Sequence, residues 1–120
     1  MTPASATEAA AREAALGNDS RVVCPRFHAA IELIGKRWSG AIIWSLSAGP
    51  LRYGELKRAV PGLSDRLLSQ RLRELESAGL VDREVQDELP VRVIYCLTEK
   101  GDGLRPAITS LGQWAERWGN

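Results

Sequence analysis

The sequence contains only two cysteines and one histidine, and this scarcity excludes several kinds of site. A zinc site needs about four ligands, and Cys24 and His28, four residues apart, have only Cys96 as a further thiol or imidazole. Two cysteines give no disulfide framework. The chain also has no glycine-rich phosphate loop. The sequence therefore predicts no metal and no cofactor.

Long apolar runs are missing as well. No segment approaches the roughly 20 apolar residues that cross a bilayer. Residues 1–20 lack the basic and apolar regions of a secretory signal, and nothing gives them a buried face, so we expect a mobile tail. The remaining residues, 21–120, suffice for one domain with a single core. We expect a soluble, cytoplasmic protein with no membrane partner.

Net charge is only +1, so nucleic-acid binding cannot be inferred from the overall balance. The distribution of charge is more informative. Residues 21–73 carry ten Lys or Arg against three acids, whereas residues 74–120 carry five against nine. Such asymmetry is expected of a protein that meets phosphates on one side, although a solvated run of charge explains it too.

The most clearly specified segment is a helix within residues 63–80. Ser64 is a favoured N-cap residue, and Gly79 followed by Leu80 predicts a stop in which Leu80 folds back on Leu75. The helical period separates an apolar stripe (Leu68, Leu72, Leu75) from an outward face of hydrogen-bond donors (Arg66, Ser69, Gln70, Arg73, Ser77). Arginine can bind guanine or phosphate and glutamine can pair with adenine, so this face has the chemistry to read a major groove.

The segments on either side of this helix predict a helix-turn-helix followed by a β-hairpin. A short helix at residues 53–59 and a turn at 60–62 precede the donor-bearing helix, which makes a helix-turn-helix. Alternation in 81–85 and again in 93–97 predicts a β-hairpin behind it. Further helices are expected at Trp38–Ala48, apolar on nearly every side and hence buried, and at Thr98–Trp118. The predicted fold is mainly α with a small hairpin, a winged helix-turn-helix.

DNA contacts follow from this fold. We expect them from Ser64, Arg66, Ser69, Gln70 and Arg73 on the donor-bearing helix. Arg52, in a short edge-strand fragment, and Arg92, at the base of the hairpin, are weaker candidates, because surface salt bridges explain them equally well.

The chain also resembles the HxlR-type family of bacterial transcriptional regulators. Three segments, in matching order and spacing, carry the resemblance: CPRFHAAIELIGKRW, LSAGPLRYGELKRAVPGLSDRLLSQRLRELESAGLVDR and LPVRVIYCLTEKG. Together they cover about residues 24–101. The resemblance implies a dimeric winged-helix protein that binds operator DNA, with the terminal helices forming the dimer.

The terminal helices carry apolar residues that fit this implication. The helix Cys24–Ile34 presents Phe27, Ile31 and Ile34, and the C-terminal helix presents Leu111, Trp114 and Trp118. A small domain has little interior left for two more indoles. We therefore expect a homodimer that joins these two helices of each subunit.

Three functions are weighed on this basis. The favoured one is a sequence-specific DNA-binding regulator, a repressor that acts as a homodimer on a palindromic operator. The first alternative is a protein-binding winged-helix module without DNA contact, which the near-neutral charge and the acidic Asp87 and Glu88 at the hairpin tip would suit. The second is a thiol-dependent enzyme using Cys24 with His28, for which no oxyanion site is evident, so we predict that the protein is not an enzyme.

Cys24 is a candidate sensor of oxidants or electrophiles. It opens a helix, where unpaired N–H groups and the positive end of the helix dipole stabilise a thiolate, and Arg21 and Arg26 add positive charge. The resemblance permits this role, since some members of the family use a cysteine at this Cys-Pro position. A structural cysteine under the dimer helices and a different, small-molecule effector are the alternatives.

Overall fold

The computed structural model describes residues 21–119 and divides the chain into two units, Met1–Lys36 and Arg37–Asn120. The tail predicted at residues 1–20 lies outside the described residues. The described part of the first unit contains α2 (Pro25–Ile34), which begins at the predicted Cys24–Pro25 step. Proline suits this position because the first N–H groups of a helix have no intrahelical acceptor.

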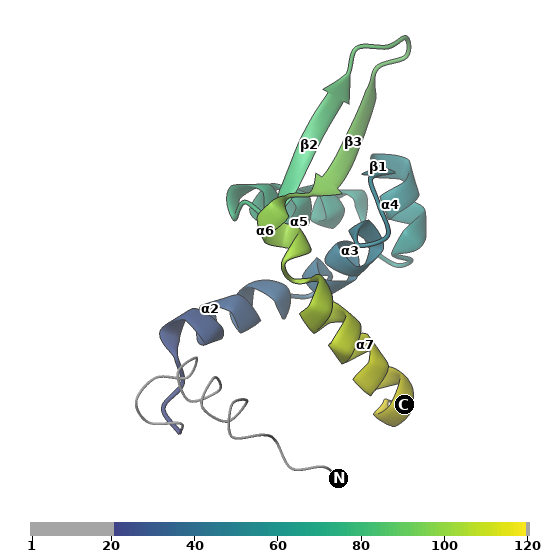
Figure 1. The fold of residues 1–120 in the computed structure, drawn as a ribbon. Coiled ribbons are helices and arrows are strands. Elements are labelled where there is room, and N and C mark those ends of the chain that lie inside the picture. Colours follow the sequence, from purple (N-terminus) through teal and green to yellow (C-terminus); the bar gives the residue numbers. More distant parts are fainter. Residues whose placement is uncertain (1–20, 120) are drawn as a thin grey trace. The chain divides into compact units, whose positions relative to one another are not determined.

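The second unit is a winged helix-turn-helix, as predicted (Figure 1). Its elements are α3 (Ser39–Leu46), β1 (Leu51–Arg52), α4 (Tyr53–Ala59), α5 (Asp65–Ser77), β2 (Val81–Gln86), β3 (Arg92–Leu97), α6 (Glu99–Asp102) and α7 (Arg105–Trp118). Helix α3 packs on α4, α7 and β3, while α5 packs on β2. None of the helices in the described residues is long and apolar enough to cross a membrane.

Both predicted ends of α5 are confirmed. The Ser64 hydroxyl accepts a hydrogen bond from the Leu67 amide at 3.2 Å, which caps the first turn. At the other end Gly79 adopts the left-handed conformation (φ +76°), and the Leu80 amide donates to the Leu75 carbonyl at 2.9 Å. This Schellman bond ends the helix and directs the chain into β2.

The apolar stripe of α5 forms the centre of the core. Leu68, Leu72 and Leu75 are completely or almost completely buried. They share the core with apolar side chains of the neighbouring elements (Ile42, Ile43, Leu46, Leu56, Val81). The opposite face of α5 is thereby directed outward by the same packing.

The sheet is a three-stranded antiparallel one with the order β1-β3-β2. Val81 pairs with Leu97 and Gln86 with Arg92, so the hairpin closes at residues 87–91. Strand β1 extends the other edge of β3, with Leu51 opposite Tyr95. In Figure 1 the hairpin projects away from the helices of this unit, as a wing does.

Two predictions about helices were wrong. Residues 98–118 form two helices, because α6 ends at Gly103 and Pro106 lies in the first turn of α7, where its missing N–H breaks no helical bond. Helix α3 is not buried on all sides, since the Trp44 side chain is 56% exposed. Trp44 instead covers α7 at Gly112, where an added Cβ would lie 2.5 Å from the indole.

Candidate nucleic-acid interface

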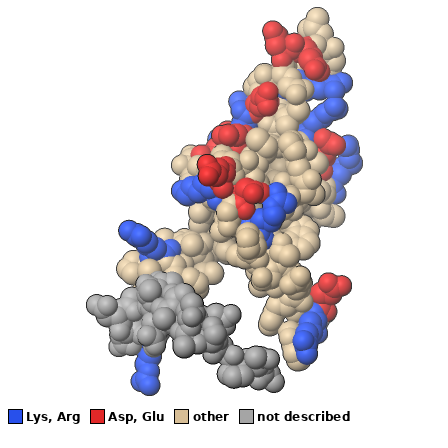
Figure 2. Space-filling view, in the orientation of Figure 1, with Lys and Arg blue, Asp and Glu red and all other residues tan. Residues whose placement is uncertain are grey.

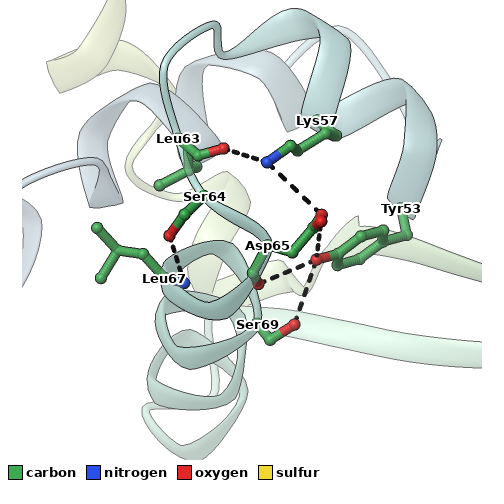
Figure 3. Close-up of polar contacts among 7 residues, drawn as sticks. All are labelled: Tyr53, Lys57, Leu63, Ser64, Asp65, Leu67 and Ser69. Carbon is green, nitrogen blue, oxygen red and sulfur yellow. Dashed lines mark hydrogen bonds and ion pairs between the residues drawn. The ribbon is translucent and has the colours of Figure 1, made fainter.

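A polar cluster fixes the position of α5 relative to α4 (Figure 3). The hydroxyl of Tyr53 lies 3.0 Å from the carbonyl oxygen of Asp65, 3.2 Å from its Oδ1 and 3.3 Å from the Ser69 hydroxyl. The ammonium group of Lys57 donates to the Leu63 carbonyl and lies 3.5 Å from Oδ1 of Asp65. The cluster therefore joins the two helices of the helix-turn-helix across the intervening turn.

The same contacts compensate the charge of Asp65. This carboxylate suits the helix dipole but would repel a nearby phosphate. Lys57 and the Tyr53 hydroxyl both approach its Oδ1, so part of its charge is balanced within the protein. Neither residue was expected from the sequence to belong to the site, because the contacts join positions eight and twelve residues apart.

The outward face of α5 carries the predicted donors. Arg66, Gln70 and Arg73 are exposed, and within residues 21–119 neither arginine makes an ion pair. The Gln70 amide nitrogen lies 3.3 Å from a Glu74 carboxylate oxygen one turn along, a contact that a base edge can replace. These three side chains remain the predicted group for contact with bases or phosphates.

The two predicted serines already have partners inside the protein. The Ser64 hydroxyl is the N-cap acceptor, and the half-buried Ser69 hydroxyl lies against Tyr53. A hydroxyl has one donor hydrogen and two lone pairs, so each serine retains capacity for a DNA group. Their main structural role, however, is to hold the first two turns of α5.

Arg71 holds α5 in place from its buried side. Its side chain is 11% exposed; Nε donates to the Arg37 carbonyl at 2.9 Å, and a terminal nitrogen lies 3.2 Å from the Glu74 carboxylate. The bond to Arg37 stabilises the turn before α3, where Trp38 has the left-handed φ of +79°. The helical period could have predicted this burial, because Arg71 lies on the same side of the helix as Leu68, Leu72 and Leu75.

The other two predicted arginines lie in the sheet, Arg52 at the end of β1 and Arg92 at the start of β3. Arg52 is exposed and its backbone N–H donates to the Glu55 carboxylate at 2.9 Å, which caps α4. Arg92 Nε lies 3.7 Å from a Glu88 oxygen, in a pair whose side chains are 40% and 54% exposed. An ion pair so open to water is weak, so it does not remove Arg92 from the candidates for phosphate contact.

Charged side chains of both signs lie on the face drawn in Figure 2. Figure 2 shows basic and acidic groups interspersed over one face, with acidic groups close to the hairpin tip. Asp87 and Glu88 there are both exposed. Any attraction for DNA must therefore come from local groups of arginines rather than from the net charge.

Cys24 is the N-cap residue of α2. The backbone amides of Phe27 and Arg26 in the first turn, together with the positive charge of Arg26, lower the pKa of its thiol. His28 is not its partner, because the imidazole Nε2 lies 2.6 Å from a Glu32 carboxylate oxygen. In residues 21–119 no three metal-ligating side chains come together.

Both predicted dimer helices present apolar side chains to solvent. On α7, Leu111, Trp114 and Trp118 are 58%, 59% and 63% exposed. On α2, Phe27 and Ile31 are exposed, and Ile34 is half-buried. Cys96, the other cysteine of the chain, is half-buried.

Comparison with known proteins identifies the family. Residues 33–120 match the model of the HxlR-like helix-turn-helix family. The chain belongs to the HxlR family. It is 45% identical over 96 residues to YvaP, an HTH-type transcriptional regulator of Bacillus subtilis. The matched segment covers 80% of this chain and 89% of YvaP. It is 43% identical to the HTH-type transcriptional regulator YodB of B. subtilis over 96 residues, or 80% and 86% of the two chains.

Solved structures of two regulators agree with this fold. The redox regulator HypR in its oxidised form superimposes with a TM-score of 0.74 at 36% identity, over 78% of this chain and 96% of that chain. Diamide-treated YodB superimposes with a TM-score of 0.68 at 42% identity, over 81% and 96%.

Membership in the HxlR family decides the functional class. The protein is a DNA-binding transcriptional regulator and not an enzyme, which dismisses the thiol-dependent enzyme. The identity of the DNA-contacting side chains stays a prediction. This prediction rests on the exposed face of α5 described above.

Proposed function

We propose that this HxlR-family protein is a homodimeric repressor that binds a palindromic operator through α5. The observation that supports it best is the outward face of α5, where Arg66, Gln70 and Arg73 are exposed on a helix anchored by Tyr53 and Arg71. Anchoring of this kind lowers the entropy lost when the helix enters a major groove. Two copies related by a twofold axis would read half-sites roughly 10 bp apart or a multiple of it.

A salt-titrated shift assay on the DNA upstream of its own coding region tests this function. Binding that releases counterions from phosphates weakens steeply as salt rises. A protein-binding module without DNA contact, which the acidic hairpin tip would suit, would give no shift at any salt concentration. No shift, on this DNA and on duplexes selected from a randomised pool, would reject the proposal.

Repression is the proposed sign of regulation. A small protein bound across a promoter excludes the polymerase by occupancy alone and needs no activating contact. In a reporter strain, deletion of the gene should raise expression from the bound promoter, and re-expression should lower it again. A fall in expression on deletion would identify an activator instead.

We further propose that oxidants or electrophiles act through Cys24. Three features support this role: the position of Cys24 at the start of α2, the backbone amides that lower its pKa, and the similarity to the redox regulator HypR and to YodB, whose solved forms include diamide-treated and quinone-bound ones. Because α2 is also a proposed dimer element, a modified Cys24 would change the spacing of the two α5 helices.

Operator affinity before and after mild oxidation tests the sensor. Wild type should lose affinity on oxidation, Cys24→Ser should not, and Cys96→Ser should behave as wild type. Equal affinity for all three proteins under both conditions would leave Cys24 a structural residue and point to a different effector.

A further inference from the structure

A groove of about 350 Å³ runs between α5 and the sheet. Its lining residues define what we name the α5–hairpin groove: Ser69, Arg73, Glu76, Arg83 and Tyr95. The first three are spaced i, i+4 and i+7 along α5, so they form one stripe of the helix. Arg83 and Tyr95 are directly paired across β2 and β3, which puts their side chains on the same face of the sheet.

The floor of the groove offers an unused hydrogen-bond donor. Tyr95 is 7% exposed, and within residues 21–119 its hydroxyl makes no hydrogen bond. No buried polar side-chain atom of the described residues lacks a partner, so this hydroxyl is not sealed in the core. It therefore opens into the groove that Tyr95 lines.

The walls of the groove carry two arginines that form no ion pair within the described residues. In the described part of the chain, Arg73 on α5 and Arg83 on β2 make no ion pair, and neither is bound by Glu76. Two guanidinium groups and a phenolic hydroxyl thus face one carboxylate. Arginine pairs arranged in this way bind phosphate oxygens with charge-assisted hydrogen bonds.

We infer that the α5–hairpin groove binds one backbone phosphate of the operator, and that Arg83 is an additional DNA-contact residue. The inference rests on the proposed binding of DNA by α5. One sugar-phosphate strand borders the major groove on each side, so a helix lying in that groove with a hairpin beside it has a strand between them. Arg73 would approach this phosphate from the helix and Arg83 from the wing.

This assignment separates two kinds of arginine. A phosphate contact positions the protein without reading sequence, whereas a base contact discriminates between sequences. Arg83 should therefore contribute equally on every duplex, and Arg66 should contribute at one base position.

The test compares Arg83→Ala, Arg83→Lys and Tyr95→Phe with wild type on a duplex selected by the wild-type protein from a randomised pool. The logarithm of the binding constant falls linearly with the logarithm of the salt concentration. Loss of one phosphate contact makes this slope shallower by about 0.9, or by about 1.8 for a dimer with two such contacts. Arg83→Ala should show this drop and lose affinity to the same degree on unrelated duplexes. Arg83→Lys should retain most of the slope, and thermal unfolding should show each variant folded.

Single uncharged methylphosphonate linkages then locate the phosphate. One neutral linkage in each half-site should weaken wild type more than Arg83→Ala, which has only the Arg73 contact to that phosphate left to lose, while linkages elsewhere should weaken both proteins equally. The acid of the groove gives a matched pair of variants: Glu76→Gln should tighten binding by removing repulsion. Glu84→Gln, which removes the same charge from the next residue of β2 and hence from the other face of the strand, should not.

Inorganic phosphate, added at constant ionic strength, distinguishes a free anion from DNA as the ligand. Suppose that inorganic phosphate binds wild type but not Arg83→Ala, while the two proteins bind DNA equally well. The groove would then be a site for a free anion, and the inference would be overturned. An unchanged salt slope for Arg83→Ala, while wild type binds the selected duplex, would also overturn it and leave the proposed function standing. Failure of wild type to select any duplex would overturn both.

Discussion

The hydroxyl of Tyr53 lies 3.2 Å from Oδ1 of Asp65 and ties the first turn of α5 to α4. It also lies 3.0 Å from the Asp65 carbonyl oxygen. This contact between α4 and α5 thus sets the angle at which α5 would be presented to DNA. Precise presentation matters because base recognition depends on hydrogen-bond geometry.

Tyr53→Phe should lower the free energy of unfolding by about 1 kcal/mol, since it removes a shared hydrogen-bonding group. Urea denaturation measures this loss. Tyr95→Phe is the matched control: its hydroxyl has no hydrogen bond within the described residues, so its loss should change stability by less than about 0.5 kcal/mol. Equal effects of the two substitutions would contradict the role given to Tyr53.

Arg71→Ala should destabilise the protein by about 2 kcal/mol, because it removes the guanidinium that donates to the Arg37 carbonyl and to the Glu74 carboxylate. Arg73→Ala, two residues along the same helix and exposed, should cost less than about 0.5 kcal/mol. Chemical denaturation of both variants separates the structural arginine from the DNA-facing one. A smaller loss for Arg71→Ala than for Arg73→Ala would reverse that assignment.

Arg66→Ala should lose discrimination at one base position of the operator, at a cost of about 1 to 3 kcal/mol if the guanidinium is bidentate to guanine. Binding to a set of single-base operator variants measures this, because the substituted protein should no longer distinguish the bases at that position. If Arg66→Ala and Arg73→Ala combined leave affinity and specificity as they were, the outward face of α5 is not the reading surface.

Trp114→Ala should weaken the dimer by about 2 kcal/mol, the size typical of a buried aromatic anchor in an interface. Its indole is 59% exposed in the isolated chain, and the neighbouring Leu111 and Trp118 extend the same apolar face. Sedimentation velocity at a series of concentrations gives the shift. Leu89→Ala, which truncates a 99% exposed side chain at the hairpin tip, is the control and should leave association intact. A wild-type monomer at micromolar concentration would refute the dimer.

Alkylation of Cys24 should become fast at a lower pH than for an ordinary thiol. The backbone amides of Phe27 and Arg26 lower its pKa, so the thiolate is populated above that lowered pKa and is protonated as the pH falls through it. The rate of reaction with iodoacetamide, measured against pH in Cys96→Ser, should therefore have its midpoint below the value of about 8.5 for a free cysteine. A midpoint at or above that value would remove the chemical basis for sensing.

Features that depend on neighbours along the chain can be predicted from the amino-acid order. The N-cap at Ser64, the stop at Gly79 and the alternation in β2 and β3 are local, because hydrogen bonds within a few residues and the backbone period decide them. The split between α6 and α7 is also local in origin. There the sequence contained Gly103 and Pro106, but only the structure decided that they separate two helices rather than bend one.

Tertiary structure decided which of these faces meet. Tyr53 and Asp65, Arg37 and Arg71, and the two walls of the α5–hairpin groove come from segments that the backbone period cannot align with one another. A period shows which side of a helix or strand an arginine occupies, but not whether that side is covered by another element. The helical period places Arg71 on the side of the apolar stripe and Arg73 on the outward face, but only packing of α5 against the core buries the first and leaves the second exposed.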